Sequence, residues 1–458
     1  MTLLHASAAS AAPLEIDEVI RRYTEYDQSL NDGAGHSRSA NSGTLGWGES
    51  GILRSYAFCY ELTGDTHWLD KIAAHFENIM ATATDEEGDG FLSWHTKRYS
   101  AVPWTAGAQP GNAGNATIVP AEGIVRRADC WKELDGQTFT ITFLPEGKIK
   151  VTDSSKDAPL VDGAAFEPEK KAPGIPLISV RIEGAPEPGD AFRIDTVPAD
   201  ALDYVVHQGM FLYPVALAME AWAGDAALFA PKRAQFERFE AFIGHNTLDR
   251  WEAEWVDVPG TDFGAYKFQD SRSQRYPNTI LPHNQFLALA RAYLVLSDIP
   301  QVKRRAEYRE KARKMYLYFR HFLTEANGAY VWNYWDVHPA LPNPHGARSG
   351  REDCSHAGLT MGCCLEAARR GFLFDDGDMR RFASTFVDVM WNGDEEKPRV
   401  GARVDTNEGD KVIFGDWALL SQWDARVAPL ITSMFEEGSA SRASVLPRVA
   451  ACQKRAAR

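Results

Sequence analysis

The chain has 458 residues, a formal net charge of −14 and a hydrophobic fraction of 44%. This length allows one large domain with an insertion, or two to three domains, and the acidic balance argues against a general nucleic-acid binder. No apolar run approaches the length of a membrane span. The six cysteines lack CxxC spacing, so we interpret them as buried thiols, and we expect neither a metal nor a cofactor.

The first element predicted is an amphipathic helix over residues 13–30, with a proline near its start. The residues before it carry no Lys or Arg and no continuous apolar stretch, so they do not have the pattern of a signal peptide. The compartment stays open: periplasmic or secreted if a signal has been removed, and otherwise cytoplasmic.

A helical hairpin then recurs along the chain. Each copy pairs a nearly all-apolar helix with a more charged amphipathic helix, and a polar break separates the two. We predict inner helices at 51–62, 207–222, 280–296, 355–368 and, shorter, 414–423, with outer partners at 66–83, 225–243, 302–322 and 378–390. A long repeat of this kind favours a mainly α fold, an (α/α)n toroid of helical hairpins, over a solenoid with a short period.

One segment breaks this pattern. Residues 105–200 are rich in Gly, Pro and Thr and contain β-type runs, among them FTITFLPEGKIKV, which predicts a hairpin turning at Pro145–Gly147. We therefore expect a small inserted β subdomain. The predicted organisation is a first toroid part over 1–104, the β-rich insertion over 105–200, the remaining toroid over 201–440 and a C-terminal tail over 441–458.

Three predicted inner helices begin at a histidine: His207, His283 and His356. In a ring of parallel inner helices these ends would meet at one face, where the helix dipoles and the unpaired N–H groups favour an anionic ligand. The other polar and aromatic residues expected around this opening are Trp47, Glu49, Arg98, Gln208, Tyr276, Trp332, Tyr334, Arg348, Arg351 and Trp417. Aromatic faces and arginines together suit an acidic sugar polymer.

The residue types also limit the reaction. No GxSxG, HExxH, P-loop or GxGxxG motif stands in a suitable context. Four carboxylates leave glycoside hydrolysis open: Glu49, Glu352, Asp353 and Asp416. The set is nevertheless dominated by His, Tyr, Asn and Arg, which suit proton removal next to a neutralised carboxylate, followed by β-elimination.

Three motifs carry a resemblance: PHNQ at 282–285, GAYVWNYW at 328–335 and EDCSHAG at 352–358. With them, the helical part of the chain resembles α/α-toroid polysaccharide lyases of the glucuronan and alginate lyase type. The resemblance implies that Asn284 neutralises the uronate carboxylate and that His283 or His356 assists as base. It also implies that Tyr334 is the acid/base, that Arg351 or Arg348 binds the carboxylate, and that Glu352 neutralises or orients it.

The expected function is therefore cleavage of a uronic-acid polysaccharide by β-elimination. Three alternatives stay open: a toroid sugar epimerase of the N-acylglucosamine 2-epimerase kind, an α/α-toroid glycoside hydrolase, and a carbohydrate-binding protein without catalysis. The sequence selects neither the uronate, nor endo or exo action, nor the oligomeric state.

Overall fold

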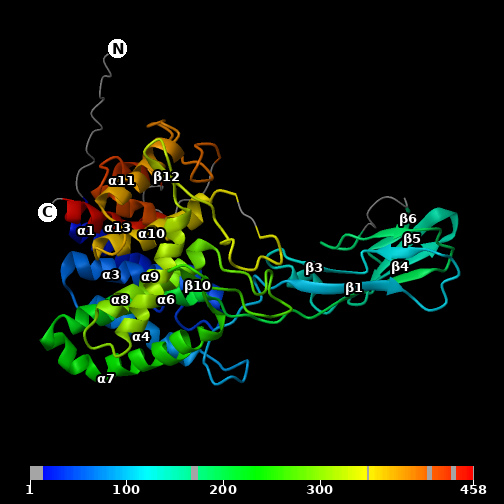
Figure 1. Cartoon of the computed structure of the whole chain (residues 1–458), viewed down its shortest axis with the longest axis horizontal. Coiled ribbons are helices and arrows are strands. Elements are labelled where there is room, and N and C mark those ends of the chain that lie inside the picture. Colours follow the sequence, from blue (N-terminus) through cyan, green and yellow to red (C-terminus); the bar gives the residue numbers. More distant parts are fainter. Residues whose placement is uncertain (1–13, 167–173, 348–349, 410–414, 435–439, 457–458) are drawn as a thin grey trace, which may run out of the picture. The chain divides into compact units, whose positions relative to one another are not determined.

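The structure is a computed structural model that describes residues 14–166, 174–347, 350–409, 415–434 and 440–456. The chain forms two compact units. The first, built from residues up to 94, 204–268 and from 278 onward, is helical, and the second, 95–203 with 269–277, is rich in strands. The prediction of a mainly α protein is confirmed (Figure 1).

The helical unit contains a set of helices whose residues are mostly buried. α6 (Val205–Ala223) is the clearest case, because it is apolar on every face and almost all its side chains are inaccessible. The other members are α3 (Ser50–Thr63), α8 (His283–Asp298), α10 (Cys354–Arg369), the 3-10 helix η6 (Gly415–Gln422) and α13 (Ala440–Ala456). A second set presents one face to solvent: α1 (Ile16–Ser29), α4 (His67–Ala81), α7 (Ala226–Ile243), α9 (Arg305–Phe322), α11 (Asp376–Ser384) and α12 (Val427–Ser433).

The buried helices follow one another in a closed series of contacts. α3 packs against α6, α6 against α8, α8 against α10 and α10 against η6; η6 then contacts α13, which returns to α3. At the α6–α8 contact, a Cβ on Gly209 would lie 2.3 Å from the backbone nitrogen of Leu289, so glycine is what lets these two backbones meet.

The C-terminal segment differs from the expectation of a tail over 441–458. It forms α13, which lies beside α1 in Figure 1, and its apolar residues Leu446, Val449 and Cys452 are buried. The interrupted apolar pattern, with Pro447 inside it, hid this helix in the sequence.

The second unit is built on a six-stranded antiparallel sheet in the order β3-β1-β8-β4-β5-β6. Its strands are β1 (Val102–Ala108), β3 (Glu122–Val125), β4 (Thr138–Leu144), β5 (Lys148–Asp153), β6 (Val161–Ala165) and β8 (Ala191–Thr196). The predicted hairpin at Pro145–Gly147 is confirmed, because β4 and β5 pair across it. Alternate residues of β4, among them Phe139, Ile141 and Phe143, fill the core of this unit.

Shorter elements complete the fold. In the second unit, β2 (Thr117–Val119) pairs with β7 (Arg181–Glu183), and residues Trp131–Leu134 form the short helix α5. In the helical unit, β9 (Trp255–Asp257) pairs with β10 (Gly264–Tyr266), and β11 (Thr324–Ala326) with β12 (Ala329–Val331). The six cysteines are buried thiols, as predicted. Over the described ranges, none of the helices combines the length and apolarity that crossing a bilayer requires.

Candidate functional site

The first turn of α10 holds a histidine–aspartate pair. Asp353 caps the helix by accepting hydrogen bonds from the backbone N–H groups of Ser355 and His356. Its other carboxylate oxygen lies 2.5 Å from Nδ1 of His356. Burial raises the pKa of Asp353, but the hydrogen bonds from His356 and the backbone outweigh this effect and hold the pKa below its ordinary value. An ionised carboxylate only accepts, so Nδ1 of His356 donates this hydrogen bond, and Nε2 is the ring nitrogen that Asp353 does not engage.

Aromatic rings surround His356. The ring of Tyr334 lies 5.0 Å from the imidazole, and the indole of Trp47 meets it edge-on at 6.0 Å. Trp47 also lies 6.1 Å from the imidazole of His207. The side chain of His356 is 34% exposed, and Tyr334 and Trp47 are partly exposed, so solutes can reach this group.

Local backbone geometry brings Trp47 to this place. Trp47 stands in the π-helix η1 (Leu45–Glu49), which follows the short helix α2 (Ser42–Thr44) and packs against α6. A Cβ on Gly46 would lie 2.7 Å from the His207 ring, so only glycine permits this approach. Ser42 bonds Nδ1 of His207 at 3.1 Å and fixes the imidazole, which is 1% exposed.

A chain of polar contacts runs from the surface toward α8. Arg351 Nη1 donates to Asn333 Oδ1 at 3.4 Å, and Asn333 Nδ2 donates to Asp336 at 2.8 Å. Asp336 lies 3.0 Å from Nε2 of His283. Arg351 is 33% exposed, and its Nε lies 4.0 Å from Oδ2 of Asp405, so part of its guanidinium reaches solvent.

His283 itself does not face this opening. Its side chain is 0% exposed and is enclosed by four aromatic rings of α8 and α9: Phe286, Tyr318, Phe319 and Phe322. Burial lowers its pKa, in spite of Asp336. Asn284, next to it, is 1% exposed. The expected roles of His283 as base and of Asn284 as carboxylate neutraliser therefore do not fit the structure.

Glu352 and Trp332 likewise belong to the interior. Glu352 is 0% exposed and accepts hydrogen bonds from the Trp332 indole and from Thr360. Burial raises the pKa of Glu352 well above its ordinary value. Glu352 was expected to orient a substrate carboxylate, and Trp332 to stack on a sugar ring. Neither expectation fits the structure, because the two side chains are hydrogen-bonded to each other in the core.

The raised pKa of Glu352 predicts how a Glu352→Gln substitution changes stability. The folded state binds the proton more tightly than the unfolded chain, so the stability that this group contributes at low pH is lost as the pH rises above about 4.3. The neutral amide keeps the hydrogen-bonding shape and avoids that loss. We expect the variant to be more stable than the parent at neutral pH by about 1–3 kcal/mol, and the difference to vanish in acid.

Urea denaturation at several pH values measures this difference. Glu325→Gln is the control, because Glu325 is 52% exposed in an ion pair with Arg381 and its change is worth about 1 kcal/mol or less. A Glu352→Gln protein that is less stable than the parent at neutral pH would contradict the conclusion that burial raises the pKa of Glu352.

Four more predicted site residues serve the core. Glu49 is 0% exposed and pairs with His75 at 2.5 Å. Gln208 bridges Ser93 and Trp251, at 3.0 Å from each. The Trp417 ring stacks on Phe386, and its indole N–H donates to the backbone carbonyl of Cys354 in α10. Asp416 accepts hydrogen bonds from the buried Arg54 and Arg448. The structure thus removes Glu49, Gln208 and Trp417 as substrate-binding residues.

Arg98 and Tyr276 belong to the second unit. There, Arg98 is exposed beside Tyr99, and Tyr276 lies under the guanidinium of Arg126 at 5.7 Å. Arg348 lies outside the described residues.

Several residues that shape the site do not stand out in the sequence. Asp353 was considered only as a hydrolase carboxylate, although an Asp three residues before a His at a helix start is a pattern that predicts their pairing. Gln285, which donates to the Tyr334 hydroxyl at 3.3 Å, and Asn333 have no such signal. Among the side chains that the structure describes, no three of His, Cys, Asp or Glu converge as metal ligands.

Comparisons with known proteins add little. No protein-family model matches the chain, and neither does any curated protein. The solved structures with some likeness include FlgL from Xanthomonas campestris, at 14% identity and a TM-score of 0.17, covering 44% of this chain and 80% of that one. Another is flagellar hook-associated protein-3 from Legionella pneumophila, at 12% identity and a TM-score of 0.18, covering 44% and 79%. Scores this low carry no argument about fold or function.

Proposed function

We propose that the protein is a lyase that cleaves a uronic-acid polysaccharide, of the glucuronan or alginate kind, by β-elimination. The observation that carries the proposal is the group formed by Asp353, His356 and Tyr334, in which an oriented imidazole lies against a phenol within solvent reach. The resemblance of the surrounding motifs to toroid lyases agrees with it. We further propose an (α/α)6 toroid, supported by the closed series of contacts among the six buried helices.

In this proposal each exposed group has one task. Arg351 binds the uronate carboxylate and draws electron density from C5, which makes the C5 proton removable. His356 takes that proton through Nε2, while Asp353 stabilises the imidazolium that forms. The C4–O bond breaks as the C4–C5 double bond forms, and Tyr334 gives its hydroxyl proton to the departing oxygen. Trp47 offers a face for the sugar ring.

An epimerase is the second candidate, because two imidazoles, those of His207 and His356, flank the same indole. Exposure favours the lyase, since His207 is 1% exposed and His356 is the accessible member. A hydrolase is less supported, because Glu49, Glu352 and Asp416 are each at most 1% exposed and engaged in the interior.

One experiment separates these functions. The protein is incubated in deuterated water with glucuronan, alginate and other uronans, and the products are followed by proton NMR. A lyase yields unsaturated chain ends, an epimerase incorporates deuterium at an uncleaved carbon, and a hydrolase releases saturated ends. We expect unsaturated ends with at least one uronan, and either of the other two products would overturn the proposal.

A further inference from the structure

A cavity lies in the helical unit. It has a volume of about 280 Å³ and is formed by residues of α3, α6 and α10 together with Leu69 of α4 and Arg455 of α13. Leu217, one of its lining residues, is ten positions after His207 on α6, or about 15 Å along the helix. The cavity is therefore distinct from the group around His356.

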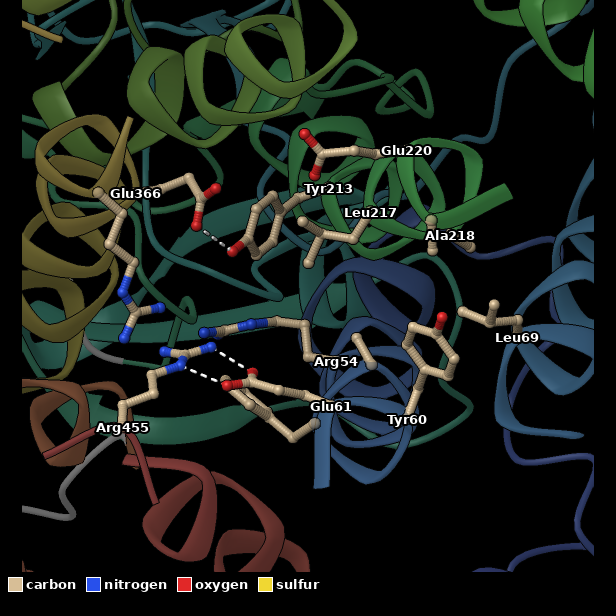
Figure 2. A pocket seen from close by; sticks show the side chains of 14 residues that line it. Arg54, Tyr60, Glu61, Leu69, Tyr213, Leu217, Ala218, Glu220, Glu366 and Arg455 are labelled. Atoms are coloured by element: carbon tan, nitrogen blue, oxygen red, sulfur yellow. Dashed lines mark hydrogen bonds and ion pairs between the residues drawn. The ribbon is translucent and has the colours of Figure 1, made fainter. Parts of the chain in front are cut away.

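The lining combines apolar and charged side chains. Phe58, Leu69, Leu217 and Ala218 provide apolar surface, and the charged members are Arg54, Glu61, Glu220, Glu366, Arg369 and Arg455. Figure 2 shows Arg455 paired with Glu61 and Tyr213 bonded to Glu366 at 2.8 Å.

Each carboxylate that lines the cavity is paired with an arginine. Glu61 pairs with Arg455 through two hydrogen bonds. Arg370, outside the lining, bonds both Glu220 and Glu366 at 2.7 Å. Arg54 is neutralised by Asp416 at 2.7 Å, and Asp416 also holds Arg448.

Arg369 also lines the cavity, and it takes part in none of the ion pairs just described. Its Nε and Nη2 atoms are buried and donate no hydrogen bond to any residue that the structure describes, and the same holds for Nη1 of Arg455. Burial and the neighbouring charge of Arg455 lower the pKa of Arg369, and the nearby charge of Glu366 offsets only part of this effect. Buried arginine N–H groups without acceptors are costly, so an acceptor that enters the cavity is stabilised.

We propose that this cavity binds a small organic carboxylate with a short apolar body, whose carboxylate is held by Arg369 and Arg455. The guanidinium fork matches the two oxygens of a carboxylate, and the apolar body lies against Leu69, Leu217 and Ala218. The inference is independent of the proposed lyase activity, because it concerns different residues and its test measures binding alone.

Isothermal titration calorimetry and thermal denaturation with hexanoate test it. Hexanol tests the need for charge, and inorganic phosphate tests the need for an apolar body. We expect hexanoate to bind and to raise the Tm of the parent protein, and hexanol and phosphate to bind at least about tenfold more weakly. Arg369→Gln should weaken hexanoate binding by about 10- to 100-fold, the worth of hydrogen bonds to a charged group.

The Tm of the ligand-free Arg369→Gln variant and hexanoate binding by Ala57→Leu provide two further tests. Arg369→Gln removes a buried charge without a counterion, so the ligand-free variant should keep or raise the parent Tm, whereas a structural arginine would lower it. Ala57→Leu narrows the cavity without changing charge and should also weaken hexanoate binding. Arg21→Gln, on the exposed face of α1, is the control and should bind as the parent does. Absence of hexanoate binding, equal binding of hexanol, or full binding by Arg369→Gln would overturn the proposal.

Discussion

Replacing Tyr334 by Phe is expected to reduce uronan cleavage by about 10²- to 10⁴-fold, the usual contribution of a positioned acid or base. The substitution removes only the hydroxyl that would protonate the departing oxygen, and it keeps the ring that packs 5.0 Å from His356. We expect the loss in kcat, with KM nearly unchanged, because the proton is transferred only in the transition state. Initial rates with the uronan that the parent cleaves best measure the effect.

Tyr330→Phe provides the matched control on the same stretch of chain. Its hydroxyl bonds Asp378 at 2.6 Å, which is part of the capping box of α11, so the same atom is removed outside the site. We expect Tyr330→Phe to retain the parent rate within about twofold, although it loses one hydrogen bond worth about 1 kcal/mol of stability. Full activity of Tyr334→Phe would remove Tyr334 as the acid.

Replacing Asp416 by Asn is expected to destabilise the protein by about 3–5 kcal/mol, the cost of breaking a buried ion pair from one side. Asp416 is 1% exposed and accepts hydrogen bonds from Arg54 at 2.8 Å and Arg448 at 2.7 Å. These hydrogen bonds link η6 to α3 and α13. The substitution therefore weakens the contacts that close the series of buried helices. Guanidinium denaturation of parent and variant measures the difference.

The pH dependence of this pair has a definite sign. Although burial raises the pKa of Asp416, Arg54 and Arg448 lower it to about 2. The stability that the carboxylate contributes is therefore present above the ordinary Asp pKa and is lost as the pH falls toward 2. The difference between parent and Asp416→Asn should shrink in that range. Asp262→Asn is the control, because the Asp262 side chain is 62% exposed in its ion pair with Arg313, and it should leave the stability nearly unchanged. An equally small effect of Asp416→Asn would contradict the central role of Asp416.

The sequence predicted the helices well because their apolar patterns are long. The beginnings expected near 207, 283 and 356 lie within about two residues of the observed α6, α8 and α10, and the hairpin of β4 and β5 turns where its PEG sequence indicated. These features are local. α13 was missed because its apolar residues are spaced irregularly, and its place in the fold depends on contacts with α3 and η6, more than 350 and about 30 residues away.

The sequence predicted only some of the site residues, because the type of a residue does not reveal whether its side chain will be buried by neighbouring helices. His356 and His283 both begin apolar helices, yet one is 34% exposed and the other is sealed by the aromatic residues of α8 and α9. The same limit applies to Glu352 and Glu49, whose carboxylates are satisfied inside the core by distant partners. Of the residues that the sequence pointed to, Tyr334, His356, Arg351 and Trp47 stay in the proposed site, and Asp353 joins them.

The most direct test of the proposed lyase is a continuous ultraviolet assay of the wild-type protein and of Tyr334→Phe with a panel of uronans. The conjugated C4–C5 double bond of an elimination product absorbs where the intact polymer does not. The account predicts a steady rise for the wild-type protein with a glucuronan- or alginate-type polymer and a rise at least about 10²-fold slower for Tyr334→Phe. A wild-type protein that produces no rise with any uronan, while remaining folded, would contradict it.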